Sequence, residues 1–208
     1  MNHLTANFPQ YDYVVVNDGS RDETAAICQR NGYNLLNLPV NLGLAGAFQA
    51  GLKYADKYGY QYAVQLDGDG QHRPEYLESM IKKMEEGYDI VIGSRFVGEK
   101  KPFTMRMLGS NLIEMAIRFT TGVNIKDPTS GMRMFSKRMI ANLHRGLTTV
   151  RSRTPFLPDP PGARVAEVPV IMDERILGVS YLTPVNAMRY MLKMLISILL
   201  IQNFRKRR

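Results

Sequence analysis

Two carboxylates one residue apart, Asp67 and Asp69, are the side chains of this sequence whose type and spacing best suit chemistry. They follow the apolar run Tyr62–Leu66, which reads as a buried strand, and the amide Gln71 comes two residues later. Open α/β sheets bind ligands at the carboxyl ends of their strands. Oxygen ligands there suit Mg²⁺ or Mn²⁺ completed by substrate phosphates. The pattern fits a metal–diphosphate site, and it fits about as well a plain Asp-Gly turn.

Strands and helices alternate along the chain, which predicts an α/β fold with an open, mostly parallel sheet and flanking helices. In such a sheet Asp18, the Asp67–Asp69 pair and Arg95 each follow a strand and therefore lie along one edge. Carboxylates there can hold a cation, and a guanidinium can bind phosphate. The expected strands are Tyr13–Val16, Asn34–Leu38, Tyr62–Leu66, Asp89–Gly93 and Arg164–Val170, and the expected helices are Asp22–Arg30, Ala45–Tyr58, Pro74–Glu86 and Met105–Thr120.

Composition narrows the class of partner. A chain of 208 residues can bury the core of one α/β domain. Its net charge of +8 favours an anionic partner such as a nucleic acid, a membrane surface or a phosphorylated substrate. The basic residues are dispersed or terminal and the strand ends are acidic, which argues against nucleic acid. The single cysteine, Cys28, excludes an intramolecular disulfide, and no stretch reads as a signal peptide, so we expect a cytoplasmic protein.

The C-terminal segment is apolar and ends in a basic cluster. Residues Met188–Ile201 are too few to span a bilayer, which takes roughly 20 apolar residues. An amphipathic helix at the inner face of the cell membrane, with Arg205–Arg208 at anionic headgroups, fits this pattern. A helix packed on its own domain, on a second copy or on a small membrane protein is the alternative. We therefore expect a catalytic domain over 1–181 and a membrane-surface or partner helix over 182–208.

A series of motifs in a fixed order resembles the family-2 glycosyltransferases. Among these, it resembles the polyprenyl-phosphate sugar transferases of the dolichol-phosphate mannose synthase and bactoprenol glucosyltransferase type. The resemblance covers nearly the whole chain outside 148–162. It is carried by Val16-Asn17-Asp18-Gly19-Ser20, Asn41-Leu42-Gly43, Gln65-Leu66-Asp67-Gly68-Asp69-Gly70-Gln71-His72, Gly93-Ser94-Arg95, Asp127-Pro128-Thr129-Ser130-Gly131-Met132-Arg133, and Glu167-Val168-Pro169-Val170 followed by Arg175, Gly178 and Ser180.

The resemblance implies a GT-A-like fold and the transfer of a sugar from a UDP- or GDP-linked donor to a polyprenyl phosphate. It implies that Asp67, Asp69 and Gln71 hold Mg²⁺ or Mn²⁺ at the diphosphate. Asp127 and Arg133 are the implied catalytic residues, Asp127 lying near the acceptor and Arg133 binding phosphate. A structural role for Asp127, as a turn carboxylate before Pro128, stays open. The implied nucleotide-sugar contacts are Val16, Asp18, Asp67, Gly68, Asp69, Arg95 and Arg175.

Two departures from the family pattern bear on activity. Family members begin with a further strand in the interior of the sheet, and this sequence starts beyond it. We expect its absence to leave unpaired backbone groups and a thinner nucleotide pocket. Residues 148–162 are rich in proline, which fits a loop, a linker or the product of a local reading-frame slip. The alternative function is therefore a catalytically impaired remnant that only binds.

Overall fold

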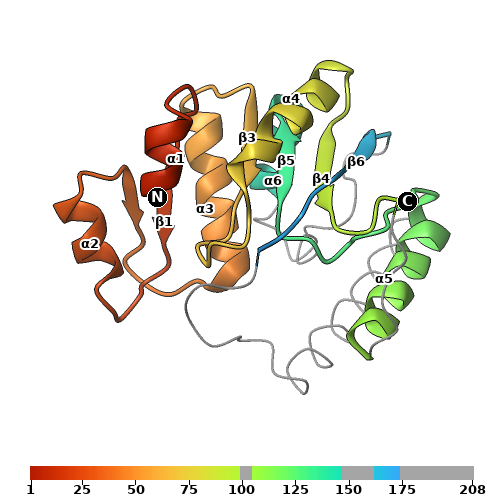
Figure 1. Ribbon diagram of the computed structural model, residues 1–208, viewed down its shortest axis with the longest axis horizontal. Coiled ribbons are helices and arrows are strands. Elements are labelled where there is room, and N and C mark those ends of the chain that lie inside the picture. Colours follow the sequence, from red (N-terminus) through yellow and green to blue (C-terminus); the bar gives the residue numbers. More distant parts are fainter. Residues whose placement is uncertain (99–104, 147–161, 174–208) are drawn as a thin grey trace.

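The computed structural model describes residues 1–98, 105–146 and 162–173, which form strands with helices packed on both faces (Figure 1). The expected strands and helices are confirmed to within about two residues at most ends. Helix α1 agrees with the reading of residues 2–10 as the end of a helix, whereas strand β5 and helix α6 were not expected. The helices are α1 Asn2–Asn7, α2 Thr24–Arg30, α3 Gly43–Lys57, α4 Leu77–Glu85, α5 Met105–Thr121 and α6 Lys137–Gly146, with a 3₁₀ turn at Pro74–Tyr76; the strands are β1 Val15–Asn17, β2 Leu35–Asn37, β3 Tyr62–Gln65, β4 Ile90–Ser94, β5 Arg133–Ser136 and β6 Val165–Pro169.

The larger sheet is mixed, which corrects the expectation of a mostly parallel one. Its strand order is β3-β5-β4-β6, with β4 and β6 parallel and β5 antiparallel to both β3 and β4. Strand β5 runs directly into α6. With four residues, Arg133–Ser136, it is too short to show an alternating pattern in the sequence.

The remaining two strands form a separate sheet. Among the described residues β1 pairs in parallel with β2 alone, and β3 pairs with β5 alone. Both β1 and β3 contact α3, so one helix supports strands of both sheets. Most residues of β1 and β3 are only half-buried, whereas all five residues of β4 are buried. Within the described residues no strand pairing joins β1 to β3, so the one sheet expected from the sequence is divided into two.

The core lies on the two faces of the larger sheet and follows the alternation of side chains along β4. Ile90 and Ile92 pack with residues of α3, α5 and α6 on one face. Val91 packs with Leu77 and Met80 of α4 on the other face. A strand covered on both sides reads as a continuous apolar run, which is why β4 was readily predicted.

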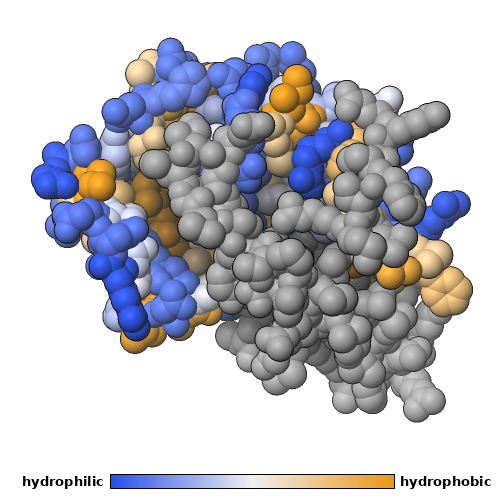
Figure 2. Space-filling model, turned by 60° about the horizontal axis from the view of Figure 1, so that its bottom comes forward, coloured by the Kyte–Doolittle hydropathy of each residue, from blue (hydrophilic) through white to orange (hydrophobic). Residues whose placement is uncertain are grey.

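The carboxyl ends of β3, β4 and β6 lie at the lower edge of the sheet in Figure 1. Figure 2 views the molecule from that side and shows a described surface that is mainly hydrophilic, with separate hydrophobic areas. No helix in the described part of the chain is long and apolar enough to cross a membrane. The proline-rich stretch up to residue 161 and the predicted C-terminal helix lie outside the described residues.

The interruption of the sheet makes a prediction for amide hydrogen exchange. The Val15 amide donates to Asn34 of the β2 side, so the Val16 amide points away from β2. Val91 of β4 has strands on both sides. We expect the Val16 amide to exchange faster than that of Val91 by about tenfold or more, measured by NMR under native conditions. Equal protection would show that β1 is paired on its second side.

Candidate functional site

The loop after β3 is shaped by its own side chains. Asp67 is exposed, and one of its oxygens accepts a hydrogen bond from the Gln65 amide at 3.2 Å. Asp69 Oδ1 accepts the backbone N–H of Gln71 at 3.1 Å, which closes a tight turn. Gly70 lies inside that turn with a φ of 79°, a conformation that suits glycine. The motif thus forms a tight turn and still leaves both carboxylates at the edge of the sheet, so the turn does not exclude a metal–diphosphate site.

A hydrogen bond from the backbone of Asp67 to the ring of His72 holds the same loop in place. The His72 Nδ1 accepts the backbone N–H of Asp67 at 2.9 Å, so the neutral ring carries its proton on Nε2. Burial lowers the pKa of His72, and the nearby carboxylates of Asp67 and Asp69 oppose this shift. The charges of Arg95 and Arg133 lower the pKa further. The ring is therefore neutral near pH 7 and lies within the electrostatic reach of four predicted site residues.

Gly131 brings the loop before β5 against the loop after β3. A Cβ atom at Gly131 would lie 2.4 Å from Asp67 Oδ2 and 3.0 Å from His72 Cε1. Neither distance is tolerable without movement, so the close approach depends on the missing side chain. The backbone of Gly131 has no positive φ, so a larger residue here would be opposed by lack of space and not by backbone strain.

Arg95 and Asp127 form a fork-like ion pair at the end of β4. Arg95 Nε and Nη2 donate to the two Asp127 oxygens, each at 2.8 Å, and the Arg95 backbone N–H adds a third bond at 3.1 Å. Asp127 is fully buried, while the Arg95 side chain keeps 32% of its exposure. Burial acts to raise the pKa of Asp127, but the bonds and charge of Arg95 outweigh it and hold the pKa below its usual range.

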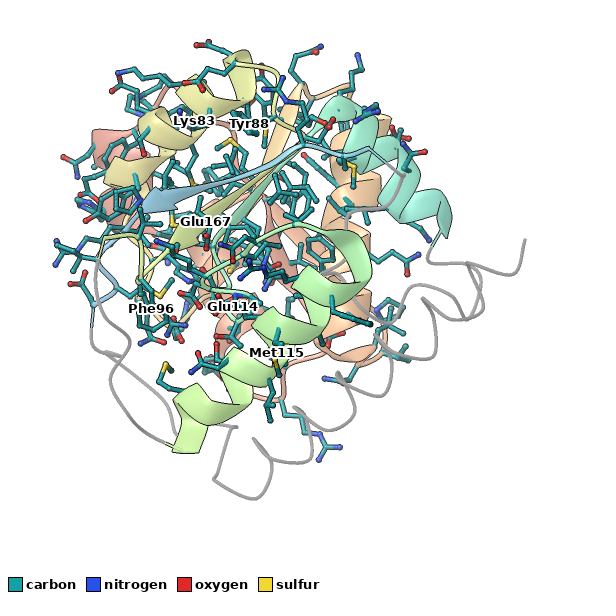
Figure 3. All side chains as sticks on the ribbon, turned by 90° about the vertical axis from the view of Figure 1, so that its right-hand side faces the viewer. Lys83, Tyr88, Phe96, Glu114, Met115 and Glu167 are labelled. Carbon is teal, nitrogen blue, oxygen red and sulfur yellow. The ribbon has the colours of Figure 1, made fainter. Side chains whose placement is uncertain are left out.

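Glu167 of β6 holds the backbone on the other side of Asp127. Its two oxygens accept the backbone N–H groups of Lys126 and Asp127 at 2.8 and 2.9 Å. Figure 3 shows Glu167 on the side of the sheet that faces α5. Sequence reasoning gave this residue no role. The feature of the sequence that could have indicated its role is that Glu167 is a single acidic residue inside an otherwise apolar strand.

Arg133 is buried at the start of β5. Its Nη2 donates to the carbonyl oxygens of Pro128, at 3.1 Å, and Ser130. The Ser130 hydroxyl in turn donates to the Gly93 carbonyl at 2.5 Å. These bonds fix the turn 127–131 against the end of β4.

Asp18 belongs to the smaller sheet and joins a different loop. Its Oδ1 accepts the Leu42 backbone N–H at 2.7 Å, and its carbonyl accepts the Asn41 amide at 2.8 Å. Gly19, with a φ of 66°, completes the turn, where a Cβ would lie 2.9 Å from the Asn41 nitrogen. Asp18 is thus held beside the start of α3, and half-buried Val16 lies against Gly51 within the same helix, both on the smaller sheet. The remaining predicted site residue, Arg175, lies outside the described residues.

The donor set at the edge suits a hard divalent cation that shares its ligands with a phosphate. Within the described ranges no group of three or more His, Cys, Asp or Glu side chains is placed to hold a metal. Mg²⁺ is usually bound by one or two carboxylates plus substrate phosphates, so the Asp67–Asp69 pair with the Gln71 amide fits such an ion. Gly131 leaves the Asp67 carboxylate room at that place.

An α/β fold with acidic and basic groups at the strand ends is shared by several classes of enzyme, and comparison with known proteins identifies the family. The profile described as "Glycosyl transferase family 2" matches residues 2–143. The chain is 31% identical over 201 residues to polyprenol monophosphomannose synthase of Mycolicibacterium smegmatis, covering 89% of this chain and 75% of that protein. It is 30% identical over 187 residues to undecaprenyl-phosphate mannosyltransferase of Micrococcus luteus, covering 83% and 76%. The chain belongs to glycosyltransferase family 2.

Solved structures with low sequence identity share the fold. Mannosyl-3-phosphoglycerate synthase from Rubrobacter xylanophilus superposes with a TM-score of 0.64 at 15% identity, covering 98% of this chain and 68% of that one. Glucosyl-3-phosphoglycerate synthase from Mycobacterium tuberculosis, in complex with Mn²⁺, UDP-glucose and phosphoglyceric acid, gives 0.63 at 18% identity, covering 96% and 73%. These matches place the chain among GT-A folds.

The Arg95–Asp127 pair makes a prediction for stability. In Asp127→Ala the guanidinium loses its buried partner, and we expect the free energy of unfolding to fall by about 2–3 kcal/mol. The matched control is Glu78→Ala, which breaks an exposed pair with Lys82 on α4 and should cost less than about 1 kcal/mol. Urea denaturation at pH 7 measures both. Equal losses in the two variants would contradict a structural role for the buried pair.

Gly131 makes a second prediction, for ligand binding. In Gly131→Ala the new methyl group displaces the Asp67 carboxylate, and we expect Mn²⁺ binding in the presence of UDP or GDP to weaken by about tenfold or more. Glu85→Ala is the control, because it removes an exposed side chain on α4 that has no part in the proposed site. Isothermal titration measures both affinities. A Gly131→Ala chain that binds Mn²⁺ as well as wild type would show that the close approach of Gly131 to Asp67 does not matter for cation binding.

Proposed function

We propose that this chain transfers a sugar from a UDP- or GDP-linked donor to a polyprenyl phosphate, with Mg²⁺ or Mn²⁺ as cofactor. The observation that carries the proposal is the acidic loop after β3, held at the carboxyl edge against Gly131 and His72. The names of the sequence relatives support the acceptor class, since two of them act on polyprenol or undecaprenyl phosphates. A structural neighbour crystallised with Mn²⁺ and UDP-glucose supports the donor class.

In this proposal the carboxylates of Asp67 and Asp69 and the Gln71 amide oxygen hold the cation. A Mg²⁺ or Mn²⁺ ion held there would stabilise the charge of the leaving nucleoside diphosphate. Val16, Asp18 and Gly68 belong to the nucleotide side, with Val16 and Asp18 supplied by the smaller sheet.

The Arg95 guanidinium is partly exposed, whereas Arg133 is buried. We therefore assign Arg95 to phosphate binding, and Asp127 orients its guanidinium. Both Asp127 oxygens already accept hydrogen bonds, so we assign this residue to positioning rather than to proton transfer. Arg133 shapes the turn 127–131 and adds positive charge near the phosphates. Arg175 keeps its proposed role at the donor phosphates.

The acceptor needs little help from a base, because a phosphate monoester carries ionised oxygens near neutral pH. One of these oxygens attacks the anomeric carbon as the bond to the nucleoside diphosphate breaks.

The acceptor lies in a membrane, and we propose that the C-terminal segment 182–208 attaches the domain 1–181 to the inner surface of the cell membrane. Helix α5 also carries exposed apolar side chains, among them Met115, and these support the proposal that the protein lies at a membrane surface (Figure 3).

A binding-only remnant of such an enzyme is the second candidate. The separation of β1–β2 from the larger sheet favours it, since Asp18 and Asp67 follow strands of two sheets that share no pairing among the described residues. Donor binding without turnover would identify this state.

The experiment that tests the proposal is transfer of radiolabelled sugar from GDP-mannose and UDP-glucose to undecaprenyl phosphate in detergent with Mn²⁺. We expect an organic-soluble product, and we expect Asp69→Ala to reduce its formation by about a hundredfold or more, because it removes a ligand of the cation. Glu85→Ala, which removes an exposed carboxylate on α4, is the control. Transfer that survives Asp69→Ala would overturn the metal-dependent mechanism.

A further inference from the structure

Arg73 and Asp173, one hundred residues apart in sequence, form a second fork-like ion pair beside the acidic loop. Arg73 Nε donates to Asp173 Oδ2 at 2.7 Å, and Arg73 Nη2 donates to the other oxygen. Arg73 lies just before the 3₁₀ turn that leads into α4, and Asp173 lies four residues after the end of β6. The pair thus ties the segment after β6 to the segment after β3.

The same two segments are joined a second time, through Gln71. Its side-chain Nε2 donates to the Asp173 carbonyl at 3.1 Å, and the Asp173 backbone N–H donates to the Gln71 carbonyl at 3.0 Å. Because the amide nitrogen of Gln71 is held by a carbonyl, the orientation of its side-chain oxygen is fixed as well. The Gln71 backbone N–H also closes the Asp69 turn, so whatever holds Gln71 holds Asp69.

We propose that Arg73 and Asp173 are positioning residues for the cation–diphosphate site: their ion pair holds the segment after β6 so that it orients the Gln71 amide and the Asp69 turn. This inference rests on the proposed function, since it assigns the pair a purpose in cation binding. Groups that orient the ligands of a metal commonly change its affinity by roughly 10- to 100-fold.

The exposure of the pair separates this role from a merely structural one. The side chains of Arg73 and Asp173 are 42% and 39% exposed, and an ion pair so exposed adds little to the free energy of unfolding. The Lys83–Glu86 pair, with exposures of 38% and 50%, is matched in this respect and lies at the end of α4. Neither of its residues is bonded to the acidic loop in the contacts of the described chain.

The test measures Mn²⁺ binding to the full chain with UDP and with GDP, by electron paramagnetic resonance, together with thermal midpoints. For Asp173→Ala and Arg73→Ala we expect about tenfold weaker Mn²⁺ binding. The double variant should bind Mn²⁺ no more weakly than the weaker-binding single variant, because the two residues act as one unit. Thermal midpoints should stay within the range set by Lys83→Ala, and Arg73→Lys should recover part of the affinity.

Each outcome decides between the two claims. If Asp69→Ala loses Mn²⁺ binding and both alanine variants bind as wild type, the positioning role is wrong and the proposed function stands. If wild type binds no Mn²⁺ with either nucleotide, both fail. Should the alanine variants unfold, Asp173→Asn decides, since it keeps the side-chain shape while removing the charge. Wild-type Mn²⁺ affinity in Asp173→Asn would then overturn the proposal.

Discussion

The placement of β5 between β3 and β4 is the constraint on which the rest of the site depends. Because β5 is antiparallel to both neighbours, it begins at the edge where they end. The turn 127–131 that precedes it therefore meets the loop after β3 on one side and the end of β4 on the other. Contact at Gly131 joins the turn to Asp67, and the Asp127 ion pair joins it to Arg95. One short strand thus brings together Asp67 and Gly131, which are 64 positions apart in the sequence, and Arg95 and Asp127, which are 32 apart.

The polar groups at this edge hold one another, and this explains how so many charges share a small volume. Asp127 is completely buried, yet Arg95, Thr129 and the backbone satisfy its oxygens. Glu167 satisfies the adjacent backbone N–H groups. A well-paired network of this kind is rigid, and the loss of Arg95 would leave the buried charge of Asp127 uncompensated. The interior pairs accordingly orient Arg95, and the acidic loop lies at the surface, where we propose that its carboxylates bind a cation.

Much of this could be predicted from the sequence, and the exceptions have physical causes. Long periodic segments such as α3 and the apolar run of β4 were readily recognised, as was the family, from motifs in a fixed order. Strand β5 was missed because four residues carry no measurable period, and with it the mixed character of the sheet. The close approach of Gly131 to Asp67 and the bonds of Glu167 depend on tertiary contacts, which local patterns do not encode. The family motifs named the candidate residues without showing that Asp127 is buried and fully bonded.

The proposed function requires that a donor site forms although β1 and β3 lie in separate sheets. A thermal melt of the full chain against UDP, GDP and their sugar conjugates, with and without Mn²⁺, tests this most directly, because a ligand that binds only the native state raises the midpoint. The account predicts one cooperative transition whose midpoint is raised by a single nucleotide family, and only when Mn²⁺ is present. A cooperative transition that no nucleotide shifts, or a shift that is the same without metal, would contradict it.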